Sequence, residues 1–194
     1  MMNTLRVLFM ATLWIFIMRL QGVCPELTQE GHALIAFKNR LNDPNNALQT
    51  WGKTDNPCSG WNNITCDDNN HVIDILLAEH ELAGELGPEL SNLTELKSLN
   101  MLNNNLTGPI PKELGLLKKL VLLDLRYNQL TGIIPRELGN CDSLLSLYLN
   151  DNQLSGAVPL DVFAHLQKDN GATIECDGNP GLCVPPYMKN ICCP

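Results

Sequence analysis

A 24-residue periodicity of apolar positions organises the middle of the chain. Three copies of the pattern begin at Leu96, Leu120 and Leu144, and a weaker copy begins at Val72. Within the copies the apolar residues fall into further columns: Ile75, Leu99, Leu123, Leu147; Leu77, Met101, Leu125, Leu149; Leu82, Leu106, Leu130, Leu154; and Leu86, Ile110, Ile134, Val158. A single coil of this length cannot enclose these side chains, so the copies are predicted to stack as a solenoid.

Polar residues and turn formers recur with the same period. An asparagine follows the predicted strand in three copies (Asn104, Asn128 and Asn152), where its amide can satisfy backbone groups of adjacent coils as a ladder. The first copy has His80 instead, which we interpret as an imperfect terminal repeat rather than a catalytic histidine. Two further columns mark a tight turn and fix the backbone after it: Gly84, Gly108, Gly132, Gly156, Pro111, Pro135 and Pro159.

The segment before the repeats has the pattern of a helical cap. Four apolar residues have helical spacing: Leu27, Leu34, Phe37 and Leu41. Thr28 is suited to cap the helix, and Asp43-Pro44 is predicted to stop it. Trp61, further along, is interpreted as a packing residue.

The eight cysteines include three groups that bear on the fold. Cys58 and Cys66 predict a local disulfide in an exported protein. Zinc binding is the alternative, but no second pair of cysteines at the spacing of a zinc finger accompanies them. Cys141 is in register with Leu93 and Leu117 and is predicted to be a buried core residue. The last four allow three pairings, and we favour the two that join the first two to the vicinal pair: Cys176, Cys183, Cys192 and Cys193.

Residues 1–24 have the features of an export signal. Arg6 precedes a 12-residue apolar run, 7–18, which is shorter than the roughly 20 residues that cross a bilayer. An uncleaved anchor is the alternative interpretation. Cleavage removes two of the 13 basic residues and none of the 21 acidic ones, and the resulting net charge of −10 argues against nucleic acid as a partner. This charge either solvates the surface or, if it gathers on one face, selects a basic partner.

The repeats and the N-terminal flank together resemble a known family. The pattern L-x-x-L-x-L-x-x-N-x-L-x-G-x-I-P, preceded by EGHALIAFKNRLNDPNNALQTW and PCSGWNNITC, is similar to plant extracellular leucine-rich repeat proteins. Short somatic-embryogenesis-type co-receptor ectodomains and small secreted repeat proteins are among its members. The resemblance implies a short α/β solenoid, a right-handed superhelix with a parallel sheet on its concave face. It also implies a second short strand in each coil and disulfide-bonded caps at both ends.

The predicted organisation has four parts. A signal peptide covers 1–24, an N-terminal cap 25–71, four repeats 72–167 and a cysteine-rich C-terminal cap 168–194. The last boundary rests on Lys168, which stands where the next leading leucine belongs. No apolar run of spanning length follows the signal, so we expect no membrane span in the mature chain.

The candidate binding site is the outward face of the predicted strands, between the inward leucines. Three apolar residues and two tyrosines there favour a partner-binding patch. The predicted partner-binding residues are Asp74, Leu76, Ser98, Asn100, Leu102, Leu122, Asp124, Arg126, Tyr127, Ser146, Tyr148 and Asn150. Four strands span only about 15 Å, which is small for a partner that buries roughly 800 Å² on each side. We therefore expect a shared interface, as in a co-receptor or adaptor.

The functional hypothesis is a secreted binding module in plant signalling or defence, located in the apoplast or cell wall. The resemblance implies a peptide or a receptor-like kinase ectodomain as partner. An inhibitor of secreted wall-degrading hydrolases, resembling polygalacturonase inhibitors, is the alternative, although those proteins have many more repeats. No enzymatic activity, cofactor or metal is expected, because the four histidines are dispersed and no catalytic motif occurs. Three sequons predict glycosylation at Asn63, Asn92 and Asn105.

Overall fold

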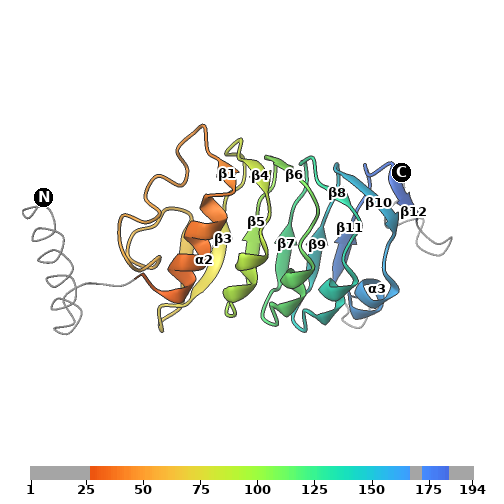
Figure 1. Cartoon of the computed structure of the whole chain (residues 1–194). Coiled ribbons are helices and arrows are strands. Elements are labelled where there is room, and N and C mark those ends of the chain that lie inside the picture. Colours follow the sequence, from red (N-terminus) through yellow and green to blue (C-terminus); the bar gives the residue numbers. More distant parts are fainter. Residues whose placement is uncertain (1–26, 167–171, 184–194) are drawn as a thin grey trace, which may run out of the picture.

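The computed structural model describes residues 27–166 and 172–183. Its coils stack side by side in a row, with the N-terminal cap at one end and the last strands at the other (Figure 1). The predicted signal peptide and two of the predicted disulfide residues, Cys192 and Cys193, lie outside the described residues. The described part therefore contains the repeats, most of the N-terminal cap and part of the C-terminal cap.

A six-stranded sheet, called the main sheet below, runs the length of this row. Its order is β11-β9-β7-β5-β3-β2, and neighbouring strands are parallel except for the antiparallel pair β2 and β3. The strands are β2 (Ile64–Cys66), β3 (Val72–Leu76), β5 (Ser98–Asn100), β7 (Leu122–Asp124), β9 (Ser146–Tyr148) and β11 (Thr173–Glu175). The main sheet thus has two strands more than the four repeats predict.

Each coil then forms a second short strand, as the family resemblance implies, and the N-terminal cap adds one more. These strands form two three-stranded sheets, β1-β4-β6 and β12-β10-β8, which an isolated bridge between Pro109 and Thr131 connects. They are β1 (Leu41–Asn42), β4 (Ala83–Glu85), β6 (Asn105–Thr107), β8 (Thr131–Gly132), β10 (Gln153–Ala157) and β12 (Gly181–Cys183). The coils return through helical turns: η1 (Pro88–Asn92), η2 (Lys112–Leu116), η3 (Arg136–Asn140) and α3 (Leu160–Leu166).

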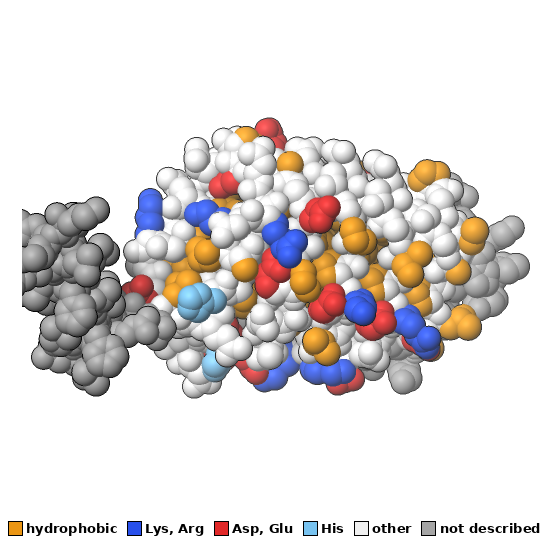
Figure 2. Space-filling model, viewed as in Figure 1, with side chains coloured by type: hydrophobic (Ala, Val, Ile, Leu, Met, Phe, Trp, Pro, Cys, Tyr) orange, Lys and Arg blue, Asp and Glu red, His pale blue; other side chains and the backbone are white. Residues whose placement is uncertain are grey.

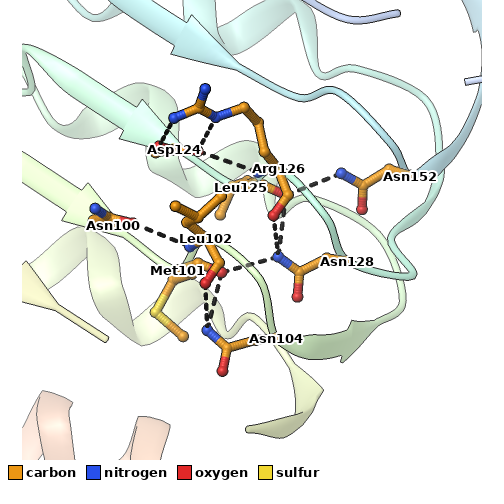
Figure 3. Close-up of polar contacts among 9 residues, drawn as sticks. All are labelled: Asn100, Met101, Leu102, Asn104, Asp124, Leu125, Arg126, Asn128 and Asn152. Atoms are coloured by element: carbon orange, nitrogen blue, oxygen red, sulfur yellow. Dashed lines mark hydrogen bonds and ion pairs between the residues drawn. The ribbon is translucent and has the colours of Figure 1, made fainter. Parts of the chain in front are cut away.

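The predicted apolar columns form the core between these layers. Leu99, Leu123 and Leu147 are fully buried, and the other column members are at most 4% exposed. The predicted ladder position is filled by buried asparagines (Figure 3). The Asn128 Nδ2 donates to the carbonyl oxygens of Met101 and Leu125 at 2.9 and 3.1 Å, and its Oδ1 accepts from the Leu106 N–H at 3.0 Å. These bonds satisfy backbone groups that the turn leaves without partners.

The repeats extend one coil beyond the predicted boundary at residue 167. Strand β11 pairs with β9 so that Ile174 lies opposite Leu147, which is a longer offset than the period of the preceding coils. Asn179 occupies the ladder position of this coil, donating to the Leu149 carbonyl at 2.9 Å and accepting from the Leu154 N–H at 3.0 Å. The coil is longer because its return segment contains the α-helix α3, where the preceding coils have a shorter 3-10 helix. A strictly constant period therefore misses it.

The N-terminal cap is built differently. Helix α2 (Gln29–Lys38) is capped by Thr28, whose Oγ1 accepts from the Gly31 N–H at 3.0 Å. The helix ends before the predicted stop at Asp43-Pro44, because the chain turns and places Leu41 in β1. The Cys58–Cys66 disulfide is formed, and the rings of Trp51 and Trp61 stack with centroids 5.7 Å apart. Both tryptophans are buried, so the cap covers the first coil with aromatic side chains.

The remaining cysteines differ in part from the prediction. Cys141 is buried as predicted, its thiol lies 3.3 Å from the Leu114 carbonyl oxygen, and burial raises the pKa of the thiol to about 11. Cys176 is buried and disulfide-bonded. The prediction that Cys183 is disulfide-bonded is wrong in this structure, where it is a free thiol. The physical reason is its position in β12, an outer strand of the second sheet, which leaves its side chain exposed.

Candidate functional site

The main sheet brings the predicted binding residues together in straight rows. Strand register places one row across the sheet at Asp74, Ser98, Leu122, Ser146 and Thr173. A second row consists of Leu76, Asn100, Asp124, Tyr148 and Glu175. The outward surface of these rows, with the residues that follow each strand, is called the sheet face below. Sequence reasoning missed its contributions from β11 because it ended the repeats too early.

The side chains on the sheet face are not equally accessible. Leu76 is 46% exposed and Tyr127 is 54% exposed. Asp124 and Asn150, which were predicted as contact residues, are buried at 3% and 8%. For these two the prediction of direct contact is corrected: Arg126 covers Asp124, and Asn150 is itself buried. The other predicted residues of the sheet face are half-buried.

Arg126 covers Asp124 and is held by it. The Arg126 Nε donates to Asp124 Oδ1 at 3.0 Å and its Nη2 donates to Asp124 Oδ2 at 2.7 Å (Figure 3). The guanidinium also lies 4.5 Å from the centre of the Tyr148 ring. The hydrogen bonds to Asp124, together with the nearby charge of Glu175, raise the pKa of Arg126. A two-point bond and a ring contact fix the guanidinium in place, and Asp124 neutralises its charge.

The residue before each ladder position, which is His80 in the first coil and an asparagine in the other four, has a left-handed backbone. The φ angles are positive in all five coils: Glu79 62°, Asn103 53°, Tyr127 53°, Asp151 53° and Gly178 68°. The turn into the ladder imposes this conformation, which costs an L-residue about 1–2 kcal/mol. A bulky aromatic at such a position is unusual. The 24-residue period identifies these positions in the sequence, but it does not show that their backbone is strained.

Asn150 is the polar side chain on this face that lacks a full set of partners. Its Nδ2 donates to Asp177 Oδ1, whereas its Oδ1 is buried and has no hydrogen-bond partner within the described residues. A buried acceptor without a donor is unfavourable by about 1–3 kcal/mol. Asn150 and Asp177 therefore form a junction between the fourth and fifth coils that a further donor would stabilise.

A second concave region lies away from the sheet face, beside the N-terminal cap. Its lining includes Glu30, His71 and the sequon residue Asn92. The Val72 N–H donates to Glu30 Oε2 at 3.0 Å, and His71 Nδ1 lies 3.7 Å from Glu30 Oε1. Burial raises the pKa of Glu30 despite both contacts. The pair joins the cap helix to the first coil of the main sheet, and no activated nucleophile accompanies it in the lining residues.

The three sequon asparagines occupy different environments. Asn92 ends η1 and Asn105 begins β6; Asn105 is exposed and Asn92 is accessible at the end of its turn. Asn105 lies in the second sheet rather than at the edge of the main sheet. Asn63 is half-buried, and its Nδ2 donates to the Ala47 carbonyl at 3.4 Å. Asn92 and Asn105 are therefore better placed for modification than Asn63.

Two kinds of feature are absent from the part of the chain that the structure describes. Within 27–166 and 172–183, no three histidine, cysteine or acidic side chains gather in a way that could hold a metal ion. Likewise, none of the helices described in these ranges is long and apolar enough to cross a bilayer.

Family models and a curated relative match parts of the chain. The model "Leucine rich repeat N-terminal domain" matches residues 27–67, and "Leucine Rich Repeat" matches 95–117 and 119–141. Leucine-rich repeat protein 1 of Arabidopsis thaliana is 44% identical over 77 residues, which cover 39% of this chain and 35% of that protein. The chain spans about a third or less of the length of the curated relatives that it matches.

Solved structures match most of the described coils. The BIR2 ectodomain from Arabidopsis thaliana is 32% identical, with 83% of this chain and 97% of that chain covered and a TM-score of 0.68. A chain of the BIR3–SERK2 complex from the same plant is 30% identical, with coverage of 79% and 95% and a TM-score of 0.66. The HAESA ectodomain of Arabidopsis in complex with an IDA peptide hormone ligand is 27% identical, with coverage of 83% and 26% and a TM-score of 0.65.

The fold and the sheet face define a leucine-rich repeat module of the kind found in the ectodomains of plant receptors. Its N-terminal cap and two of its repeats are matched by their family models, and it aligns with nearly the whole of the BIR2 ectodomain and of a chain of the BIR3–SERK2 complex. The chain belongs to the leucine-rich repeat family of plants.

Proposed function

We propose that this chain binds another protein through its sheet face, and that the partner is a peptide or the ectodomain of a receptor-like kinase in plant signalling or defence. The observation that carries the proposal is Tyr127. It is 54% exposed and held at φ 53°, so it adds little to the core and sits where asparagine or glycine would be less strained. Tyrosine is enriched among residues that dominate binding energy. Contact with a partner accounts for an aromatic residue in this position.

The relatives support a protein partner. One matched structure is a complex between BIR3 and SERK2, and another contains a peptide hormone ligand on an ectodomain. The main sheet is also longer than four repeats predict. Six strands span about 24 Å, enough for an extended peptide of about seven residues to cross the sheet at about 3.4 Å per residue. A shared interface remains our expectation for a larger partner, because one such sheet provides a limited area.

The proposed place of action is outside the cell, in the apoplast or cell wall. Residues 1–24 have the features of an export signal, and the matched BIR2 structure is an ectodomain. Asn92 and Asn105 are proposed to carry glycans, because both lie off the main sheet. Secretion from plant cells, followed by mass spectrometry of the glycopeptides, tests both statements. Retention of the chain inside the cell would contradict the proposed location.

A pair of variants tests the sheet face. The secreted protein is recovered from plant extracellular fluid with its partner, and the affinity for that purified partner is measured by surface plasmon resonance. Tyr127→Asn is expected to weaken binding at least tenfold while raising the melting temperature, because asparagine tolerates the left-handed backbone. Ile133→Asn removes another exposed apolar side chain, 62% exposed and located beside β8, and should leave binding unchanged.

Two results would reject the proposal. Equal binding by wild type and Tyr127→Asn, with both folded, would show that the sheet face is not the site. Recovery of a wall-degrading hydrolase whose activity is lost on mixing would favour the inhibitor function instead.

A further inference from the structure

The concave region beside the N-terminal cap, called the cap concavity below, lies where the cap meets the first coil. Three segments line it: residues 28–30 at the start of α2, residues 70 and 71 in the loop between β2 and β3, and Asn92 and Thr94 around the end of η1. Figure 2 shows histidine side chains (pale blue) at this end of the molecule. Its volume is about 270 Å³, slightly below the roughly 300–1,000 Å³ of pockets that hold drug-sized ligands. The cap concavity therefore has room for a ligand of about the size of one sugar ring.

One sequon opens directly on the cap concavity. Asn92 and Thr94 are the two recognition residues of that sequon, and both are exposed. Neither side chain makes a hydrogen bond with the part of the chain that the structure describes. The Nδ2 groups of the other two sequon residues, Asn63 and Asn105, each donate to a backbone carbonyl at 3.4 Å. The Asn92 amide can thus carry a sugar without losing a hydrogen bond to the described residues.

The opposite wall of the cap concavity offers an acceptor that is only partly used. Glu30 is half-buried, and its Oε2 accepts from the Val72 N–H at 3.0 Å. Its Oε1 has only a long contact with the described residues, 3.7 Å to His71 Nδ1, which is beyond the usual range of a hydrogen bond. A carboxylate oxygen has two lone pairs, and its hydrogen bonds are stronger than those of neutral acceptors. This wall is therefore suited to the hydroxyl and acetamide donors of a sugar.

The loop that carries Asn70 and His71 is already held in place. Asp67 Oδ1 accepts from the N–H groups of Asn69 and His71 at 3.0 and 2.9 Å. The Asn70 N–H donates to the Asp67 carbonyl at 3.0 Å. A ligand that binds a preformed wall loses less free energy to the ordering of its site.

We propose that the first N-acetylglucosamine of a glycan on Asn92 occupies the cap concavity, where it bonds to Glu30 and His71 and ties the N-terminal cap to the first coil. The N-glycosidic bond joins Asn92 Nδ2 to C1 of the sugar, with a lipid-linked diphosphate as the leaving group and the release of one amide proton. The bond holds the sugar at an effective concentration on the order of millimolar, so weak contacts suffice to seat it. This inference rests on the proposed glycosylation of Asn92 and is independent of the partner of the sheet face.

Melting of defined glycoforms tests the inference. The full chain is secreted from plant cells treated with kifunensine, which keeps N-glycans in the oligomannose form, and mass spectrometry of glycopeptides reads occupancy at Asn92. Asn92→Gln should lower the melting temperature by about 2–4 °C, the shift that about one net hydrogen bond gives in a domain of this size. The control Asn105→Gln removes a glycan from the second sheet and should leave the melting temperature nearly unchanged. Endoglycosidase H leaves only the first sugar on each asparagine, so trimming should not lower the melting temperature of wild type.

A double-mutant cycle locates the seated sugar. Asn92→Gln should lower the melting temperature less in the Glu30→Gln background than in wild type, because the sugar then lacks a charged acceptor. Glu113→Gln provides the matched control, since Glu113 lies in η2 and outside the cap concavity. In that background the effect of Asn92→Gln should equal the effect in wild type.

The outcomes separate this inference from the proposals on which it rests. An unmodified Asn92 overturns both the glycan at this position and its seat. Equal shifts for Asn92→Gln and Asn105→Gln, or additive effects of Asn92→Gln and Glu30→Gln, overturn the seat alone. So does a melting temperature that falls on trimming to the Asn92→Gln value, because the outer sugars then carry the effect. Partner binding by the sheet face is read separately through Tyr127→Asn.

Discussion

The two ends of the main sheet are built by different rules. At the N-terminal end, β2 runs antiparallel to β3, and a helix, a disulfide and a tryptophan pair close the core. At the C-terminal end, β11 stays parallel and Asn179 continues the ladder of the repeats. The first end is a separate unit fitted onto the stack, and the second is one more coil of the stack. Stability is therefore expected to depend on packing at one end and on backbone hydrogen bonds at the other.

The largest effect is expected from Trp61 in the N-terminal cap. Trp61 is 3% exposed, stacks on Trp51, and donates through Nε1 to Thr54 Oγ1 at 2.9 Å. Trp61→Ala should lower the free energy of unfolding by about 3–5 kcal/mol, because it leaves a large cavity. Urea denaturation followed by circular dichroism measures the change.

Trp61→Phe is the matched control. It keeps an aromatic ring and loses the hydrogen bond, so its loss should be about 1–2 kcal/mol. A loss as large as that of alanine would assign the stability of the cap to the hydrogen bond rather than to packing.

A smaller and more local effect is expected from Asn179 in the fifth coil. Asn179→Ala removes the acceptor of the Leu154 N–H and the donor to the Leu149 carbonyl. Unsatisfied buried groups should lower the free energy of unfolding by about 1–3 kcal/mol. Hydrogen exchange of the Leu154 amide should accelerate, whereas that of the Leu106 amide, which bonds to Asn128 Oδ1, should remain protected. Unchanged exchange at Leu154 would mean that the fifth coil is not part of the ladder.

These two ends also show what the sequence could and could not predict. The apolar columns located the regular coils because each coil repeats the same burial at the same interval. The fifth coil was missed because α3 lengthens its return segment and shifts the register. A constant period aligns Lys168 with Leu144, whereas in the structure Ile174 lies opposite Leu147. The cap disulfide was predictable from a short cysteine spacing, but the pairing of β2 with β3 carries no periodic signal.

The outward side of the main sheet was predicted in outline for a similar reason. Strand alternation places residues such as Leu76 and Tyr148 outward wherever the period is known. It does not show that Arg126 folds back and buries Asp124, because that depends on a contact between side chains. Nor does it show that Tyr127 has a left-handed backbone, which follows from the turn geometry of the folded coil. Accessibility and strain are properties of the tertiary structure.

The smallest predicted effect is a pH dependence at the N-terminal end. The pKa of Glu30 is raised above its ordinary value of 4.5, first because burial disfavours the charged carboxylate. A raised folded-state pKa means that the folded protein binds the proton more tightly than the unfolded chain. The contribution of Glu30 is therefore most favourable below about pH 4.5 and is lost as the pH rises through the folded-state pKa. Glu30→Gln removes this dependence while retaining an acceptor for the Val72 N–H.

Unfolding of the two proteins at pH 4 and pH 7 measures the difference. The stability of wild type relative to Glu30→Gln should be greater at pH 4 than at pH 7. The opposite trend would show that the contact with His71, which lowers the pKa of Glu30 when charged, outweighs burial. Asn179→Ala should shift stability equally at both pH values, because its hydrogen-bonding groups do not titrate. The contact of Glu30 with the first strand of the stack thus makes the N-terminal end more stable in acid than at neutral pH, because this partly buried carboxylate has a raised pKa.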